Sequence, residues 1–315
     1  MAFDEIIGHD NIKNQMFISI DNNTFSHAHI ISGEDGIGKS LIARKAASEF
    51  LSRQGLPGFK VDIVEFKLLE DKKSIGIDEV KNIIREANRK PTVGKNKVII
   101  IYNSDKITET AQNALLKTVE EPPDGIVIIM LCEKLDIILD TIKSRCQIHK
   151  LNRLKEEEMK IFLKRKFHNL SDDYIKSVCA FSDGVPGRAE KFISDKIFHE
   201  IRNKTLDILK NSGKDEFEKV FQYENFFIEN KNEWQEMFTC LLSYIRDALV
   251  YKETGNKSMV INIDKFIEIK GIAEEFSFNK LIKIIDIVKD TSNKLKRNVN
   301  FTLVFDSMLL NMQEV

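Results

Sequence analysis

Short apolar runs in the first half of the chain alternate with amphipathic stretches. The runs typical of buried strands cover residues 27–33, 61–67, 97–101, 125–131 and 146–151. Between them, apolar residues recur every three or four positions, which indicates helices over 38–51, over 76–90, and from about Thr108 to the helix-ending pair Pro122-Pro123. Strands that alternate with helices in this way predict a parallel sheet with helices on both faces.

The strand signal fades after Leu151. The periodicity predicts three short helices over 155–167, 171–184 and 185–193, and longer helices such as 232–253 and 278–298. Residues 258–264 fit either a loop or a strand. We therefore expect an α/β class followed by all-α, with a nucleotide-binding-type domain over 1–151, a small helical domain over 152–198 and a larger helical domain over 199–315.

Length and charge restrict the classes of protein. A chain of 315 residues favours two or three domains. The formal net charge of −1 supplies no overall basic field, so the composition gives no sign of a free-standing nucleic-acid binder. The polar start lacks the pattern of a secretory leader, and the run 126–132 is too short to span a bilayer.

The four cysteines are scattered without a CxxC pair. This spacing argues against a zinc knuckle and against a disulfide framework. We expect a soluble, reduced, cytoplasmic protein without a membrane partner and without a bound metal centre of its own.

The stretch GEDGIGKS fits the phosphate-binding P-loop pattern in full, and it lies between a predicted strand and a predicted helix. Gly33, Gly36 and Gly38 allow the tight backbone path, and backbone N–H groups then converge on phosphate oxygens at the helix N-terminus. Lys39 would reach the β- and γ-phosphates, and the Ser40 hydroxyl would ligate Mg²⁺. The motif predicts a cradle for ATP or ADP with Mg²⁺.

The acidic residues that would use such a cradle are missing. Hydrolysis needs a carboxylate after a neighbouring strand to hold the metal and a second one to orient water. After the run 98–101 the chain instead carries Tyr102 and Asn103. Asp105 comes four residues after Ile101, and we expect it to make local hydrogen bonds in a turn.

Other carboxylates could replace the missing pair. Asp62 and Glu65 on the predicted strand 61–67, and Glu121 beside the prolines, are the candidates. Catalytic geometry tolerates little displacement, so the sequence favours a protein that holds nucleotide without hydrolysing it.

Several motifs together resemble a known family. NALLKTVEEPP and TIKSRCQ, with FDEIIGHDNIKNQM, HAHIISGEDGIGKS and SIGIDEVKNI, resemble the AAA+ subunits of DNA polymerase sliding-clamp loaders over roughly the first 190 residues. The resemblance implies an AAA+ P-loop domain, a small helical lid and a C-terminal helical collar through which loader subunits assemble.

The chain departs from the active members of this family at four places. Tyr102-Asn103-Ser104-Asp105 stands in place of Asp-Glu-Ala-Asp, and Gly187 stands where motor members tend to have Arg. Cys132 and Glu133 stand near the place of a Thr or Asn that senses the γ-phosphate. The segment 51–62 lacks the cysteines of the zinc module found in many bacterial members. The resemblance therefore implies a member without ATPase activity and without zinc.

The same resemblance gives Arg145, in the SRC triplet, the role of an arginine finger. It would act in trans on ATP bound to a neighbouring subunit, because a guanidinium stays charged and makes two directed hydrogen bonds. The implied partners are the other loader subunits, of delta and gamma/tau types, in a pentamer. Through the assembly they include the sliding clamp and primer-template DNA, as part of a DNA polymerase III holoenzyme.

Three alternatives remain at this stage. The first is an active loader ATPase that uses an unusual carboxylate. The second is a P-loop kinase, for which no Arg-rich lid or acceptor pocket is evident in the sequence. The third is an AAA+ scaffold outside replication.

Overall fold

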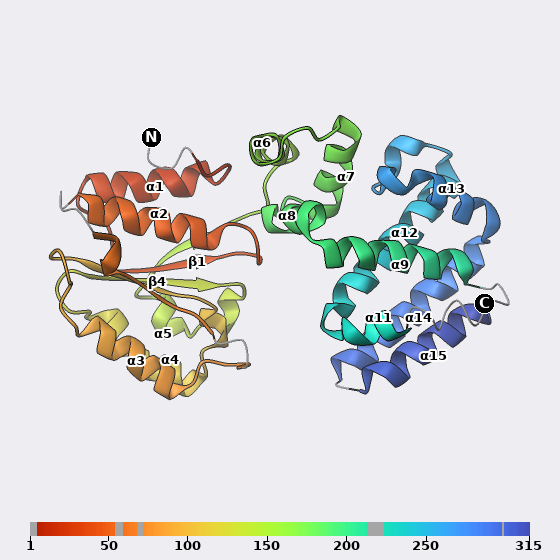
Figure 1. Ribbon diagram of the computed structural model, residues 1–315. Helices are drawn as coiled ribbons and strands as arrows, with labels where there is room; N and C mark the ends of the chain where they lie inside the picture. Colours follow the sequence, from red (N-terminus) through yellow and green to blue (C-terminus); the bar gives the residue numbers. More distant parts are fainter. Residues whose placement is uncertain (1–4, 54–58, 69–71, 213–223, 298) are drawn as a thin grey trace. The chain divides into compact units, whose positions relative to one another are not determined.

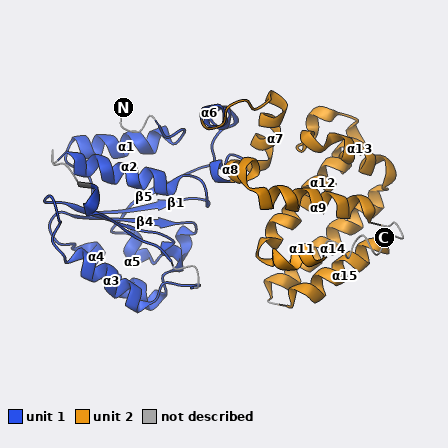
Figure 2. Ribbon diagram, viewed as in Figure 1, with its two compact units in different colours: residues 1–165, 183–187 blue, residues 166–182, 188–315 orange. Residues whose placement is uncertain are grey.

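The computed structural model describes residues 5–53, 59–68, 72–212, 224–297 and 299–315. The chain forms two compact units, the first of residues 1–165 and 183–187 and the second of residues 166–182 and 188–315 (Figure 2). None of the helices in these described ranges is long and apolar enough to cross a membrane. Residues 3–4 of the opening motif and residue 298 of the predicted helix 278–298 lie outside the described residues.

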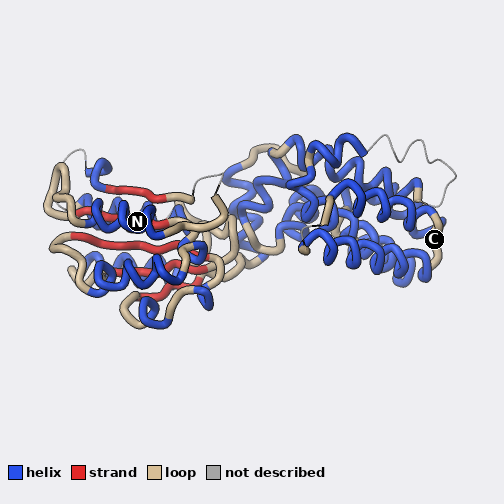
Figure 3. Tube along the Cα trace, turned by 90° about the horizontal axis from the view of Figure 1, so that it is seen from below, coloured by secondary structure: helices blue, strands red, loops and turns tan. Residues whose placement is uncertain are grey.

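The first unit is built on a parallel sheet of five strands (Figures 1 and 3). The strands are β1 (Ala28–Ser32), β2 (Ile63–Phe66), β3 (Lys97–Ile101), β4 (Ile126–Cys132) and β5 (Gln147–Lys150). Their order is β2-β3-β4-β1-β5, and every described pair is parallel. The chain leaves β1 beside the end of β4, because Ser32 pairs with Cys132.

Helices cover both faces of this sheet, as the alternating pattern predicts. On one face lie α1 (Asp10–Asp21) and α2 (Lys39–Ser52), and on the other lie α3 (Ile77–Ala87), α4 (Glu109–Glu120) and α5 (Asp140–Lys143) (Figure 1). Successive residues of a strand point to opposite faces, so Val98 and Ile100 pack with α1 and α2 while Ile99 and Ile101 pack with α3 and α4. The α/β prediction is confirmed.

The region after β5 is helical throughout its described part. Its helices are α6 (Glu156–Lys166), α7 (Asp172–Ser182), α8 (Pro186–Ser194), α9 (Lys196–Asn211), α11 (Glu224–Glu229), α12 (Trp234–Thr254), α13 (Phe266–Glu275), α14 (Phe278–Lys296) and α15 (Phe301–Gln313). Residues 258–264 form no strand; they contain parts of two 3-10 turns, Lys257–Met259 and Ile263–Lys265. The predicted all-α second half is confirmed, whereas the three-domain division at 151 and 198 stays a prediction.

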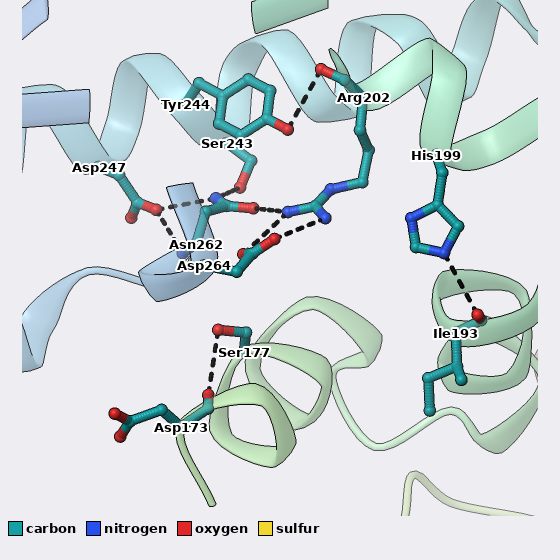
Figure 4. A network of polar contacts seen from close by, with 10 residues as sticks. All are labelled: Asp173, Ser177, Ile193, His199, Arg202, Ser243, Tyr244, Asp247, Asn262 and Asp264. Carbon is teal, nitrogen blue, oxygen red and sulfur yellow. Dashed lines mark hydrogen bonds and ion pairs between the residues drawn. The ribbon is translucent and has the colours of Figure 1, made fainter. Parts of the chain in front are cut away.

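A buried polar network lies inside the second unit (Figure 4). Arg202 of α9 donates to both carboxylate oxygens of Asp264, at 3.0 and 3.2 Å, and to the Asn262 side chain at 3.1 Å. Asp247 of α12 accepts from the backbone N–H groups of Ile261 and Asn262 at 3.0 and 2.7 Å. The irregular segment 258–264 is therefore attached to two helices by charged groups rather than by apolar packing alone.

Candidate functional site

The P-loop stands between β1 and α2, which is the strand–loop–helix context that the sequence predicts. Gly36 and Gly38 have φ values of 77° and 107°, so both adopt the left-handed region that a side chain disfavours. Lys39 begins α2, and its ammonium donates to the carbonyl oxygens of Gly33 and Glu34 at 2.8 and 2.7 Å. The loop thus folds around its own lysine, and α2 begins directly after it, so the N-terminal end of this helix lies at the loop.

The surroundings of Lys39 are partly buried and acidic. Burial lowers the pKa of the Lys39 ammonium, while the nearby carboxylates of Asp35, Glu133 and Asp105 act in the opposite direction. Burial also raises the pKa of the Cys132 thiol to about 12, so Cys132 is a neutral thiol at physiological pH. Burial therefore outweighs the three carboxylates in setting the pKa of Lys39, which lies below its ordinary value.

The segment 183–187 lies directly against the P-loop within the first unit. The Gly187 N–H donates to the Gly36 carbonyl at 2.9 Å, and a Cβ built on Gly187 would be only 2.6 Å from the Gly36 Cα. Arg153 adds an ion-pair bridge, because its guanidinium contacts Glu34 at 2.6 Å and also pairs with Asp183. Only a residue without a side chain at position 187 permits this close approach to Gly36.

We expect the substitution Gly187→Ala to separate segment 183–187 from the P-loop. The added methyl group meets backbone, which cannot rotate away, so the contact should weaken by about 1 to 3 kcal/mol. Hydrogen exchange of the intact chain, followed by mass spectrometry, should show faster exchange in peptides covering residues 34–40 and 183–187. Gly271→Ala is the matched control, because nothing lies within 4 Å of its Cβ and alanine suits a helix. Equal protection in Gly187→Ala and the unmodified chain would contradict this contact.

Tyr102 occupies the place of the first expected acid and closes a polar cluster beside the sheet edge. Its hydroxyl donates to Glu65 Oε2 at 3.2 Å. Arg44 of α2 grips the same carboxylate with two hydrogen bonds of 2.5 and 2.8 Å, and these bonds lower the pKa of Glu65. Burial raises the pKa of the Tyr102 phenol, so that group remains neutral. Both carboxylate oxygens of Glu65 thus accept hydrogen bonds, one from Arg44 alone and the other from Arg44 and Tyr102.

The other two substitute carboxylates are no better placed. Asp62 accepts backbone hydrogen bonds from Thr92 at 2.5 Å and Val93 at 3.0 Å; burial opposes its ionisation, but these donors lower its pKa overall. It therefore holds the turn before β3. Glu121 follows α4 and is exposed. No described residue pairs with its carboxylate.

Asp105 differs from the expectation drawn from the sequence. It does lie in a turn, the 3-10 segment Ser104–Lys106 between β3 and α4, and it is only 8 % exposed. Its carboxylate nevertheless acts on the Lys39 ammonium and the Cys132 thiol, and no hydrogen bond of its side chain occurs among the described residues. The fold brings it toward the cradle because β3, which precedes Asp105, and β1, which precedes the P-loop, are parallel and end at the same edge of the sheet.

Arg145 lies just after α5, at the surface of the first unit. Its Nη2 donates to Glu120 Oε1 at 2.9 Å, and its Nη1 donates to the Thr141 carbonyl at 2.9 Å and to the Ser144 hydroxyl at 3.3 Å. The side chain remains 36 % exposed. Arg145 is thus a partly exposed cation whose guanidinium is held by three acceptors.

Sequence reasoning missed Arg153 and the hollow beside it. A cavity of about 320 Å³ lies between the start of α1 and the segment 150–158, and its lining includes His9, Lys150 and Arg153. His9 also contacts the Ile37 carbonyl of the P-loop at 3.3 Å. Nothing in the spacing of these residues signals the contact, because it depends on how segment 150–158 returns across the edge of the sheet. The predicted absence of metal stays a prediction.

Two family models match the chain. One, described as DNA polymerase III, delta subunit, matches residues 8–155, and the other, DNA polymerase III, delta subunit, C terminal, matches residues 197–314. Together they cover most of the sequence, including the P-loop, Arg145 and the helical second half.

Named relatives agree with these models. DNA polymerase III subunit delta' of Bacillus subtilis is 24 % identical over 322 residues, covering 95 % of this chain and 94 % of the relative. The delta' subunit of Buchnera aphidicola (subsp. Baizongia pistaciae) is 29 % identical over 250 residues, or 77 % and 71 % of the two chains. DNA polymerase III subunit gamma of Buchnera aphidicola (subsp. Schizaphis graminum) is 25 % identical over 88 % of this chain and 85 % of its own.

A solved structure shares the fold. The gamma subunit-related protein of Thermotoga maritima superposes with a TM-score of 0.53 at 19 % identity, over 97 % of this chain and 98 % of that one. At this identity the likeness concerns the fold alone.

Proposed function

The chain belongs to the delta-prime family of DNA polymerase III clamp-loader subunits, and we propose that it serves there without hydrolysing ATP itself. The observation that carries this proposal is the Tyr102 cluster. A neutral phenol stands where a metal-directing carboxylate is needed, and one candidate replacement, Glu65, is bound by Arg44 and Tyr102. Without such a carboxylate, neither the metal nor the attacking water is held in the position that hydrolysis requires.

The phosphate cradle itself fits ATP or ADP. The left-handed glycines, Lys39 and the Ser40 hydroxyl at the start of α2 are the donor set that binds a polyphosphate, and Ser40 would be the ligand for Mg²⁺. Bound nucleotide would supply only negative charge and shape here. We therefore propose that it has a structural role, with Lys39 leaving the Gly33 and Glu34 carbonyls for phosphate oxygens.

The functional group that remains is Arg145. It is exposed, permanently charged and fixed in orientation, and it lies outside the chain's own cradle. These properties support the role of an arginine finger that stabilises the transferred phosphoryl group on a neighbouring gamma- or tau-type subunit. The other loader subunits are the proposed direct partners, with the sliding clamp and primer-template DNA reached through the assembly in the cytoplasm.

The absence of turnover can be tested on the isolated chain. We expect steady-state ATP hydrolysis of the purified protein to equal that of Lys39→Ala, because the neutral Tyr102 phenol stands where the metal-directing carboxylate is needed. Nucleotide released from the denatured protein, measured by chromatography, should be ATP or ADP in the unmodified chain and should be reduced in Lys39→Ala. Hydrolysis that Lys39→Ala abolishes would contradict the proposal.

One observation favours a second candidate function, an active ATPase. Asp105 is the nearly buried carboxylate whose charge acts on Lys39, so it is the group that could direct a metal there. Under this alternative Asp105→Asn would abolish hydrolysis as fully as Lys39→Ala, whereas under the proposal neither substitution changes a rate that is already at background.

A further inference from the structure

Glu120 is the one carboxylate that pairs with Arg145 in the described part of the chain. Its Oε1 accepts from Arg145 Nη2 at 2.9 Å, and this bond raises the pKa of the guanidinium. Both side chains are substantially exposed, at 36 % for Arg145 and 50 % for Glu120. An exposed pair of this kind contributes little to the free energy of folding, so its use has to be sought in orientation rather than in stability.

The position of Glu120 is unfavourable for its own helix. It is the last residue of α4, and the C-terminal end of a helix carries partial negative charge, which repels a carboxylate. The following Glu121 and the two prolines fix where the helix ends. Residues that are unfavourable for local helix stability are often found at functional sites. The group that the Glu120 carboxylate contacts is Arg145.

The α4 helix is also a rigid support for the residues around Arg145. Leu115 and Val119 of α4 share one buried core with Ile142 of α5. The Gln112 side chain accepts from the Leu139 N–H at 2.9 Å, which ties the start of α5 to the same helix. Glu120 therefore projects from an element whose position relative to Arg145 is already set by packing.

We propose that Glu120 is the positioning residue for Arg145, holding the guanidinium ready for a phosphoryl group on a neighbouring subunit; this rests on the finger role proposed above. Three acceptors, Glu120, the Thr141 carbonyl and the Ser144 hydroxyl, fix the two terminal nitrogens. The Nε–H has no acceptor in the described part of the chain, so one directed donor stays available. A free arginine side chain has many rotamers, and Glu120 removes most of them before the subunits meet.

The test uses the complete loader reconstituted with its clamp and primed DNA, with ATPase rates measured per assembled complex. At the ATP site that this subunit completes, we expect Glu120→Ala to lower kcat for stimulated hydrolysis by about tenfold with little change in KM for ATP, since a misplaced guanidinium stabilises the transition state less while ATP binding in the ground state is little affected. Glu120→Gln keeps an acceptor oxygen and should recover part of the rate. Glu121→Gln is the matched control, because it removes the same charge one residue away without touching Arg145.

A second comparison separates positioning from general damage. In the double variant Glu120→Ala/Arg145→Ala the rate should equal that of Arg145→Ala alone, because Glu120 acts only through the guanidinium. A further loss in the double variant, or a normal kcat in Glu120→Ala while Arg145→Ala is impaired, would overturn the positioning role and leave the proposed function intact. A normal kcat in Arg145→Ala would instead remove the finger role proposed for Arg145.

Discussion

A loader assembled with the Arg145→Ala subunit should lose most of its DNA- and clamp-stimulated ATPase at the site that this subunit completes. An arginine finger is worth roughly 10³- to 10⁵-fold in the rate of phosphoryl transfer, because it places a fixed positive charge on oxygens that become more negative in the transition state. The total ATPase rate of the loader should fall by the fraction that this site contributes. It should fall further if hydrolysis at the other sites depends on hydrolysis at this one. Single-turnover hydrolysis, measured with one loader per primed template, is the direct measurement.

The exposure of Arg145, a conservative variant and a neighbouring control make the substitution interpretable. The side chain is exposed and lies after α5, so its loss removes no core contact and assembly measured by gel filtration should be unchanged. Arg145→Lys should be nearly as impaired, since an ammonium lacks the planar fork. Lys143→Ala is the matched control, because Lys143 pairs with Asp140 of its own helix at 2.7 Å. An unimpaired rate in assembled Arg145→Ala loader would remove the finger assignment.

The candidate site was predictable from the sequence where the chemistry is local. The P-loop spacing predicts the strand, the turn and the helix start, and all three occur, because glycine conformations and helix polarity depend on neighbouring residues. The absence of the expected acids was also predictable, because Tyr102 and Asn103 directly follow the predicted strand 97–101. The two-class fold follows from periodicity in the same way.

Contacts between distant segments were not predictable. His29 and His149 lie 120 residues apart on β1 and β5, and only the strand order places their ring nitrogens 3.2 Å from each other. The contact between Gly187 and the P-loop residue Gly36, and the proximity of Asp105 to Lys39, were not predictable for the same reason. Each depends on which strands are neighbours and where a helix returns, and a sequence of alternating strands and helices is compatible with several such orders.

In the second unit, a contact between distant segments that the sequence does not predict buries a charged side chain, and its loss should cost more stability. Arg202 lies on α9 among buried residues such as Ile201 and Leu206, although arginine side chains are mostly exposed in folded proteins. The structure buries it: the guanidinium carbon lies 4.2 Å from the ring centroid of Phe192 and the terminal nitrogens pair with Asp264 (Figure 4). A buried charge of this kind is tolerated only because its partner is equally well placed.

We expect Arg202→Met to lower the free energy of unfolding of the second unit by about 3 to 5 kcal/mol. Methionine fills much of the volume, so most of the loss comes from leaving the Asp264 carboxylate without its cation rather than from a cavity. Trp234 on α12 is the only tryptophan of the chain and lies in this unit, so its fluorescence during urea unfolding reports on the relevant transition. The midpoint should fall with little change in slope.

Removing the partner as well distinguishes an unpaired charge from lost packing. In Arg202→Met/Asp264→Leu no carboxylate remains unpaired, so the double variant should be more stable than Arg202→Met alone, as found when buried ion pairs are replaced by apolar side chains. Lys294→Met is the matched control: it breaks the exposed pair with Asp290 on α14 and should change stability by less than about 1 kcal/mol. If Arg202→Met were no more destabilising than Lys294→Met, the ion pair would not hold segment 258–264 in place, and its apolar neighbours, such as the buried Val260, would have to do so instead.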